Sequence, residues 1–112
     1  MIEQRDLFLV PFPFSDQSGR KVRPVIVISN NEFNKDSEDV IVIGVTSNIS
    51  KDKYTISLFN DNLVEGKLST RCCIKVENIL KIEKEIIIKK IGKINKDTLK
   101  EIISKLFEML KY

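Results

Sequence analysis

The sequence contains no histidine. The side chain that most often exchanges protons near neutral pH is therefore absent, and so is the commonest metal ligand. Histidine-based catalytic triads and zinc sites built on imidazole are excluded. The two standard glycine-rich phosphate loops, G-x-x-x-x-G-K-[ST] and G-x-G-x-x-G, do not occur either. The familiar catalytic templates do not apply, and the sequence gives no reason to expect a cofactor or a metal.

Cysteine is scarce, with only Cys72 and Cys73, which are adjacent. Neighbouring side chains of a strand point to opposite faces, and a disulfide between neighbours is strained and rare. Two adjacent thiols also cannot supply the four spaced ligands of a structural zinc site. We therefore expect two reduced thiols, one packed and one exposed, in a cytoplasmic protein.

Long apolar runs are also missing. No run approaches the roughly 20 residues of a membrane-spanning helix, and the N-terminus lacks the basic and then apolar build of a signal peptide. We expect a soluble protein with no membrane association and one domain over residues 1–112, with 42% hydrophobic residues for a core. The net charge of +3 divides into −1 for residues 1–56 and +4 for 57–112, which permits a nucleic-acid or acidic partner without requiring one.

Short segments rich in apolar and β-branched residues predict strands, at 23–29, 40–47, 54–59, 70–76 and 84–94. Residues 5–14 also favour a strand, but two prolines remove backbone donors there, which suits a sheet edge. Gly44 suggests a bulge or a close backbone approach. The polar segments 30–39 and 60–69 are expected to be loops, the first with room for one helical turn. Residues 77–83 fit either a short turn or a helix.

The C-terminal segment has the spacing of an amphipathic helix. Apolar residues recur every three or four positions from Leu99 to Leu110. Asn95 is expected as the N-cap, with Asp97 in the first turn, where negative charge is favourable. The apolar stripe should face the core or a dimer partner. Short strands followed by one such helix predict a mainly β (α+β) fold, a small and strongly bent sheet or barrel closed by a C-terminal amphipathic helix.

With the familiar templates excluded, a set of cationic and hydroxyl side chains remains as the candidate chemistry. They are Ser18, Arg20, Lys21, Arg23, Thr46, Ser47, Thr70 and Arg71. A guanidinium stays protonated, and its planar fork matches phosphate oxygens. Such a set therefore suits binding a phosphodiester and stabilising charge that develops on it. Arg23 stands immediately before Pro24 and the apolar run 25–28, so a rigid strand would hold this charge in place.

Three stretches together resemble the MazF/PemK toxin family, the ribonuclease half of bacterial toxin–antitoxin pairs. They are LFLVPFPFSD (7–16), SGRKVRPVIVISNN (18–31) and VIVIGVTS (40–47), and the likeness continues more weakly through LSTRCCIKVENILKIEK (68–84) to the terminal helix. The resemblance implies an SH3-like β-barrel, a homodimer and a cognate antitoxin partner. It also implies metal-independent cleavage of single-stranded RNA, in which the 2′-hydroxyl attacks the adjacent phosphorus to leave 2′,3′-cyclic phosphate and 5′-hydroxyl ends.

On this resemblance, Arg23 matches the family's catalytic arginine and Thr46 its catalytic threonine. Arg23 would neutralise charge developing on the phosphorus and protonate the leaving 5′-oxygen, while Thr46 would hydrogen-bond a non-bridging oxygen. The residue that deprotonates the 2′-hydroxyl is not identified, with Asp16 a conceivable helper. The expected RNA-binding residues are Asp16, Ser18, Arg20, Lys21, Ser47, Asn48 and Arg71.

The chain departs from the family pattern at three places. Many relatives have Gly-Asp where this chain has Arg5-Asp6, an acidic residue in place of Ser18, and Arg-Cys-Asp in place of Arg71-Cys72-Cys73. Two other functions stay open, the first of them because of the loss of two acids. One is a non-catalytic barrel that binds nucleic acid or a protein, and the other is a structural dimer subunit that regulates its partner's transcription.

Ordinary structural roles also fit the candidate residues. Arg23 could be a solvated residue flanking a strand, and Thr46 could satisfy its own backbone at a strand end. Arg20 and Lys21 could form a plain solvated loop rather than steer a substrate. Arg71 could pair with a surface carboxylate instead of RNA. The basic series near the C-terminal third is expected to be a solvated face: Lys81, Lys84, Lys89, Lys90 and Lys93.

Overall fold

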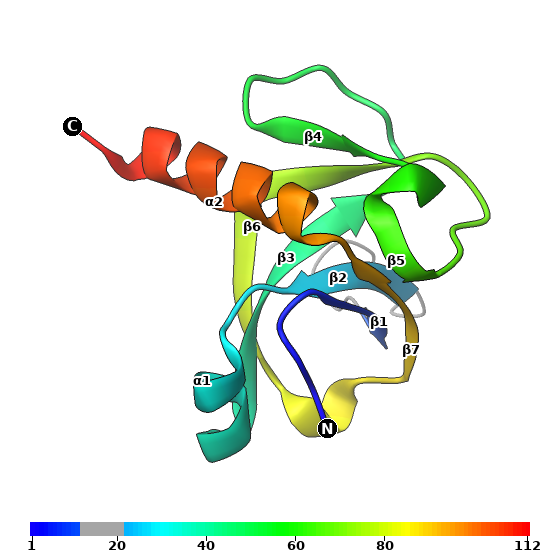
Figure 1. Ribbon diagram of the computed structural model, residues 1–112, viewed down its shortest axis with the longest axis vertical. Helices are drawn as coiled ribbons and strands as arrows, with labels where there is room; N and C mark the ends of the chain where they lie inside the picture. Colours follow the sequence, from blue (N-terminus) through cyan, green and yellow to red (C-terminus); the bar gives the residue numbers. More distant parts are fainter. Residues whose placement is uncertain (12–21) are drawn as a thin grey trace.

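The computed structural model describes residues 1–11 and 22–112. Within these ranges, seven strands form one antiparallel sheet in the order β4-β6-β3-β2-β1-β7-β5. They are β1 (Asp6–Pro11), β2 (Val22–Val27), β3 (Asp39–Thr46), β4 (Thr55–Leu58), β5 (Leu63–Gly66), β6 (Cys72–Glu83) and β7 (Lys89–Ile94). The sheet curls into a half-barrel, and the helix α2 (Lys96–Leu110) packs beside β6 (Figure 1). The predicted mainly β fold with a C-terminal amphipathic helix is confirmed.

Burial on both faces of the sheet explains the unbroken apolar run of β2. Ile26 belongs to the main core together with Ile43 of β3 and Ile102 of α2. Val25 and Val27 point to the other face, where they pack in a second cluster with Phe8, Val10, Val40 and Val42. All three β2 residues are fully buried. A strand that is covered on both sides buries apolar surface at every position. Its sequence therefore lacks the alternation of apolar and polar residues that a half-exposed strand shows.

Gly44 lies at an irregularity of the sheet, as predicted. Ile43 of β3 pairs with Ile79 of β6, but the next residue, Gly44, pairs with Lys75, so the β6 residues between these partners bulge out. A Cβ atom at position 44 would lie 3.2 Å from the Cβ of Asn78. The absence of a side chain at Gly44 therefore allows the bulged part of β6 to approach β3 closely.

Four predictions about where strands lie differ from the structure. β1 is not an edge strand, because it lies between β2 and β7 and its proline stands only at its last position, Pro11. Residues 77–83 form neither a turn nor a helix, since they continue β6 along β3. The segment 60–69 contains the 3₁₀ turn η1 (Asn60–Asn62) and the strand β5, which is stabilised by pairing with the distant β7. Residues 84–94 begin with a second 3₁₀ turn, η2 (Lys84–Ile86), and only then enter β7.

Both helices begin at asparagine caps. The side chain of Asn30 accepts a hydrogen bond at the start of the short helix α1 (Asn31–Asp36), inside the polar connection 30–39. Asn95 does the same for α2, where its side chain accepts from the Thr98 N–H at 2.8 Å, as predicted.

Neither helix of the described ranges has the length and apolar character needed to cross a membrane.

The apolar stripe of α2 divides into two parts. Its core-facing part, Leu99, Ile102 and Leu106, packs on the main cluster. Its outer part remains exposed, with 50% exposure at Ile103, 70% at Phe107 and 71% at Leu110. The helix therefore presents an apolar face that the described residues of this chain leave uncovered.

The lysines of β7 are not uniformly solvated as predicted. The carboxylate of Asp6, only 1% exposed, lies 3.2 Å from the ammonium of Lys90 and 3.9 Å from that of Lys93. Hydrogen bonds to Glu65 and Asp6 raise the pKa of Lys90. A buried carboxylate requires nearby cations, and Asp6 finds them in two lysines of β7. These ion pairs therefore join the start of β1 to β7.

Candidate active site

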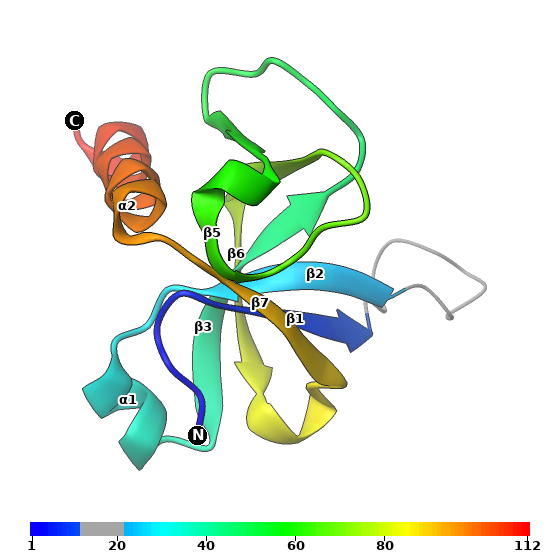
Figure 2. The same ribbon diagram turned by 45° about the vertical axis from the view of Figure 1, so that its right-hand side comes forward.

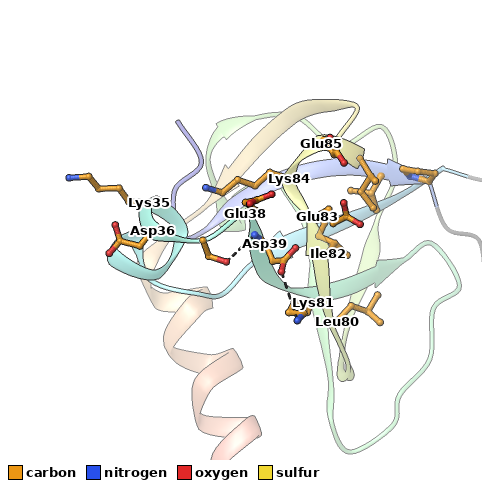
Figure 3. Close-up of a pocket in the computed structure, with 14 residues that line it drawn as sticks. Lys35, Asp36, Glu38, Asp39, Leu80, Lys81, Ile82, Glu83, Lys84 and Glu85 are labelled. Atoms are coloured by element: carbon orange, nitrogen blue, oxygen red, sulfur yellow. Dashed lines mark hydrogen bonds and ion pairs between the residues drawn. The ribbon is translucent and has the colours of Figure 1, made fainter.

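The larger of two hollows described on this surface is acidic. It measures about 1270 Å³ and opens between α1 and the far end of β6 (Figure 3). Five carboxylates line it against three ammonium groups: Asp36, Glu38, Asp39, Glu83 and Glu85, with Lys35, Lys81 and Lys84. The hydrogen bond and negative charge of Glu85 raise the pKa of Glu83. A hollow with this excess of negative charge repels a polyanion, so its size does not make it a nucleic-acid site.

A smaller cavity of about 310 Å³ lies at the opposite end of β3. The start of β2, the end of β3, the following loop and the bulge of β6 form its walls. Three predicted site residues line it, namely Arg23, Thr46 and Asn48. Its lining also includes three residues that sequence reasoning missed: Ser50, Lys75 and Asn78.

The register of β2 and β3 brings Arg23 and Thr46 to the same cavity. Val25 pairs with Gly44, and side chains two residues apart on a strand share a face. Arg23 and Thr46 each lie two residues beyond that pair, so both belong to the face on which Gly44 has no side chain to fill the space. The beginning of β2 and the end of β3 lie on the side of the molecule away from α2 (Figure 2). Arg23 is half-buried there.

Thr46 is oriented by its own loop. Its hydroxyl oxygen accepts a hydrogen bond from the backbone N–H of Asn48 at 3.1 Å. This is the local contact expected of an ordinary strand-end threonine. A hydroxyl has one hydrogen and two lone pairs, so accepting this bond leaves its hydrogen available to a ligand oxygen. The local contact and a binding role are therefore compatible.

Lys75 brings a second cation to the cavity. Its ammonium lies 3.0 Å from Asp52 and 3.5 Å from Glu77, and it donates to the hydroxyl of Ser50 at 3.5 Å. The side chain of Lys75 is only 20% exposed. The hydrogen bond with Asp52 raises the pKa of Lys75, and the same contact lowers the pKa of Asp52. Lys75 therefore stays positively charged at neutral pH.

The remaining predicted residues lie outside the cavity lining or outside the described residues. Ser47 is exposed and does not line the cavity. The guanidinium of Arg71, also exposed, lies 4.8 Å from the ring centroid of Phe59, a cation–π contact that neither expectation for Arg71 included. Asp16, Ser18, Arg20 and Lys21 fall outside the described ranges, so their predicted roles stay predictions.

The prediction of one packed and one exposed cysteine is wrong, because both are buried. Cys72 is 5% exposed and Cys73 is fully buried, and neither forms a disulfide. The Cys73 thiol donates to the carbonyl of Ser50 at 3.8 Å, so the loop after β3 covers it. Burial raises the pKa of the Cys72 thiol, which makes it a poor nucleophile. Over the two described ranges, no three Cys, Asp or Glu side chains are grouped in a way that could hold a metal ion.

Comparison with known proteins gives a family match and several structural matches. A family model described as a PemK-like, MazF-like toxin of type II toxin–antitoxin systems matches residues 3–110. A crystal structure of MazE–MazF from Deinococcus radiodurans is similar with a TM-score of 0.78 and 18% identity, over 97% of this chain and 95% of that one. The Mycobacterium tuberculosis toxin MazF-mt6 is similar with a TM-score of 0.76 and 14% identity, over 96% and 100%. An endoribonuclease in complex with its cognate antitoxin from a mycobacterial species is similar with a TM-score of 0.74 and 17% identity, over 100% and 99%.

Proposed function

We propose that this chain, which belongs to the family of PemK-like, MazF-like toxins of type II toxin–antitoxin systems, is an endoribonuclease that cleaves single-stranded RNA without a metal ion. The observation that carries this proposal is that Arg23 and Thr46 line one cavity. The two residues lie far apart in the sequence, and the family resemblance gives both of them catalytic roles. Structural relatives that are described as endoribonucleases support the same activity.

The proposed reaction is an internal transfer of the phosphodiester. A bond forms between the 2′-oxygen and phosphorus, and the bond from phosphorus to the 5′-oxygen breaks. The 2′-hydroxyl gives up its proton to a base, and the leaving 5′-oxygen gains a proton from Arg23. The products are a 2′,3′-cyclic phosphate and a 5′-hydroxyl, and no residue is assigned here as the base.

Arg23 and Thr46 would stabilise the charge that builds on the phosphoryl oxygens. The guanidinium is a fixed positive charge at the start of a strand that is buried on both faces, so it needs little reorganisation during the reaction. The Thr46 hydroxyl donates its free hydrogen to a non-bridging oxygen. Asn48 and Ser47, in the loop after β3, are proposed to contact the neighbouring nucleotide.

Arg71 is proposed to bind RNA beside the cavity. Arg71 immediately precedes β6, and Cys73, two residues after it, pairs with Thr46 at the end of β3. The Phe59 ring holds the guanidinium on one side, which limits its rotamers and leaves the other face for a base or a phosphate. Asp16, Ser18, Arg20 and Lys21 are proposed to contribute further RNA contacts.

The partners proposed for this chain are a second copy of itself and a cognate antitoxin. Several structural relatives are complexes with an antitoxin, which supports the second. A disordered acidic tail of such an antitoxin would lie across the basic cavity and exclude RNA. The exposed apolar residues of α2 supply a surface that a dimer could cover. Light scattering of the purified chain would give the oligomeric state directly.

The activity is tested by incubating the purified protein with RNA in the presence of EDTA. Wild type should cut, whereas Arg23→Ala and Thr46→Ala should each lose about 100-fold or more of the rate, as for removal of one oxyanion-stabilising donor. Lys84→Ala, which removes a cation from the acidic hollow instead, should cut like wild type. RNA left intact by wild type as well as by every variant, or cut equally by all of them, would exclude catalysis by this pair. Binding without scission would favour the non-catalytic barrel.

A further inference from the structure

Lys75 is a cation of the cavity to which the proposed reaction assigns no role. Lysine is seldom buried unless it is paired, and Lys75, at 20% exposure, has its closest partner in Asp52. Asp52 belongs to the loop between β3 and β4, and its side chain is 66% exposed. One member of this pair is therefore held by a strand and the other by a solvated loop.

The sheet directs Lys75 toward the Arg23 and Thr46 side of the cavity. Lys75 pairs with Gly44 on β3 and with Thr55 on β4. Because Gly44 has no side chain, β3 places no side chain between Lys75 and the space beside Thr46. Ser50 and Asp52 of the loop contact the ammonium instead, and Glu77 of β6 lies 3.5 Å from it.

The contacts of Asp52 are those that a phosphate oxygen would make. A single carboxylate oxygen, Oδ2, accepts from the Lys75 ammonium at 3.0 Å and from the Ser50 hydroxyl at 3.3 Å. An ammonium and a hydroxyl converging on one anionic oxygen make a common phosphate-binding arrangement. Asp52 occupies it with an anion that belongs to the chain itself.

We propose that Lys75 and Ser50 form a second phosphate-binding subsite for RNA, next to Arg23 and Thr46, and that Asp52 occupies this subsite until a backbone phosphate of RNA displaces it. This inference rests on the proposed function, because it concerns the same cavity. The exchange replaces one anion by another, so Lys75 keeps a partner throughout and no charge is left buried without one. Asp52 returns to solvent, and ion pairs with an exposed partner are weak.

Binding of a non-cleavable oligonucleotide tests the subsite. The probe is a short single-stranded oligonucleotide made of 2′-deoxynucleotides, and its affinity is measured over a series of salt concentrations. Lys75→Met should weaken binding about three- to tenfold at low salt and reduce the slope of log affinity against log salt by about 0.7, the value for one phosphate contact in a single strand. Asp52→Asn should tighten binding several-fold, because the competing anion is gone.

An ion pair between β6 and β3, at the other end of these strands, provides the matched control. Lys81 of β6 lies 3.8 Å from Asp39, and both belong to the acidic hollow. Lys81→Met and Asp39→Asn make the same charge changes as the test variants, and both should leave the salt slope unchanged. Melting temperatures show whether each variant is folded, and the tighter binding expected of Asp52→Asn cannot arise from unfolding.

Three results would overturn the subsite. Lys75→Met could leave the salt slope at the wild-type value or change it no more than Lys81→Met does. Asp52→Asn could weaken binding as Lys75→Met does, in which case Asp52 only supports the lysine. Lys75→Met could bind a polyglutamate peptide more weakly than wild type does and yet bind the oligonucleotide as tightly. That result would assign the cavity to an acidic protein segment.

The binding assay and the cleavage assay can fail separately. RNA that stays intact with wild type, combined with opposite affinity changes in Lys75→Met and Asp52→Asn, would reject the catalytic proposal and keep the subsite. Cleavage that depends on Arg23 and Thr46, combined with an unchanged salt slope in Lys75→Met, would reject the subsite alone.

Discussion

At the scale of single residues, local contacts orient two polar groups of the cavity, the Thr46 hydroxyl and the Lys75 ammonium. The hydroxyl oxygen of Thr46 accepts from Asn48 and keeps its hydrogen. The ammonium of Lys75 is shared between Asp52, Glu77 and Ser50. In each case a local contact fixes the orientation of the group, so little conformational freedom is lost when a ligand binds.

The first prediction concerns the Thr46 hydroxyl. Thr46→Val keeps the shape of the side chain but removes the hydroxyl, so we expect a loss of about 100- to 1000-fold in the cleavage rate. Thr46→Ser keeps the donor and should stay within about tenfold of wild type. Single-turnover cleavage in EDTA measures both rates. A valine variant as fast as wild type would show that Thr46 is only a strand-end residue.

The second prediction concerns Arg5, which has φ = 83°, a left-handed conformation that costs a non-glycine residue about 1 kcal/mol or more. A glycine at this position would avoid this cost. The Arg5 guanidinium compensates by donating to the carbonyl of Ile94 at 2.9 Å. Arg5→Ala loses that bond and keeps the strain, whereas Arg5→Gly loses the bond and relieves the strain. Urea unfolding should find the glycine variant more stable than the alanine variant by about 1 kcal/mol. The opposite order would mean that the positive φ costs nothing here.

At the scale of elements, the bulge between β3 and β6 shapes the cavity. Gly44 has no side chain to fill the cavity, and the β6 residues opposite it bulge out. Asn78, which belongs to that bulge, becomes part of the cavity lining. The same irregularity places Lys75 opposite Gly44. A regular ladder would shift this register and with it every side chain that β6 contributes.

The third prediction therefore concerns Gly44. A Cβ at this position would lie 3.2 Å from the Cβ of Asn78, so Gly44→Ala should displace Asn78 and narrow the cavity. We expect cleavage to fall about tenfold and stability to fall by about 1–2 kcal/mol. Gly92→Ala is the control, because its Cβ would meet the carbonyl oxygen of Glu65 at 2.7 Å, between β5 and β7. Gly92→Ala should destabilise the fold at least as much, with less effect on the cleavage rate constant of the folded protein. Equal rate losses in both variants would assign the effect to general destabilisation.

Elements with strong local signals could be predicted from the sequence, and elements that depend on distant partners could not. The Asn95 cap and the apolar run of β2 depend on residues that are neighbours in the sequence, and both predictions are confirmed. β5 and the second half of β6 exist because β7 and β3 pair with them, which no local pattern shows. Lys75 is the clearest case at the site. Its place between Ile74 and Val76 indicates that it faces away from them, but only the register with Gly44 brings it to the cavity.

At the scale of the whole molecule, charge is separated between the two ends of β3. The acidic hollow includes Asp39 at the start of that strand, and the cavity includes Thr46 at its end, about 23 Å away at the rise of an extended strand. The two regions carry groups whose pKa values shift in opposite directions. Glu83 in the hollow has a raised pKa, and Asp52 over the cavity has a lowered one.

The fourth prediction uses the signs of these shifts. A carboxyl whose pKa is raised by folding destabilises the fold when it is charged, and the penalty disappears as the pH falls through its folded pKa. Glu83→Gln should therefore raise Tm at pH 7 and have no such effect well below pH 4.5, the ordinary value for this group. A carboxyl with a lowered pKa stabilises the fold above its unfolded value. Asp52→Asn should therefore lower Tm at pH 7, and the difference should vanish only as the pH falls below 3.8.

Scanning calorimetry across this pH range measures both effects. Gln at position 83 leaves the cavity untouched, so this variant also serves as a cleavage control and should cut RNA like wild type. A fall in Tm for Glu83→Gln at pH 7 would show that the acidic hollow is not a site of electrostatic repulsion.

The most direct test of metal-free transesterification at Arg23 and Thr46 is a substrate with one 2′-deoxynucleotide immediately before the bond that is cut. In EDTA, we predict that wild type binds this RNA as tightly as the all-ribose strand and leaves that bond intact, because the attacking oxygen is missing. The all-ribose strand should yield a 2′,3′-cyclic phosphate and a 5′-hydroxyl, identified by mass spectrometry. Cleavage of the substituted bond at the wild-type rate would contradict the mechanism, since a water molecule rather than the 2′-hydroxyl would then be the nucleophile.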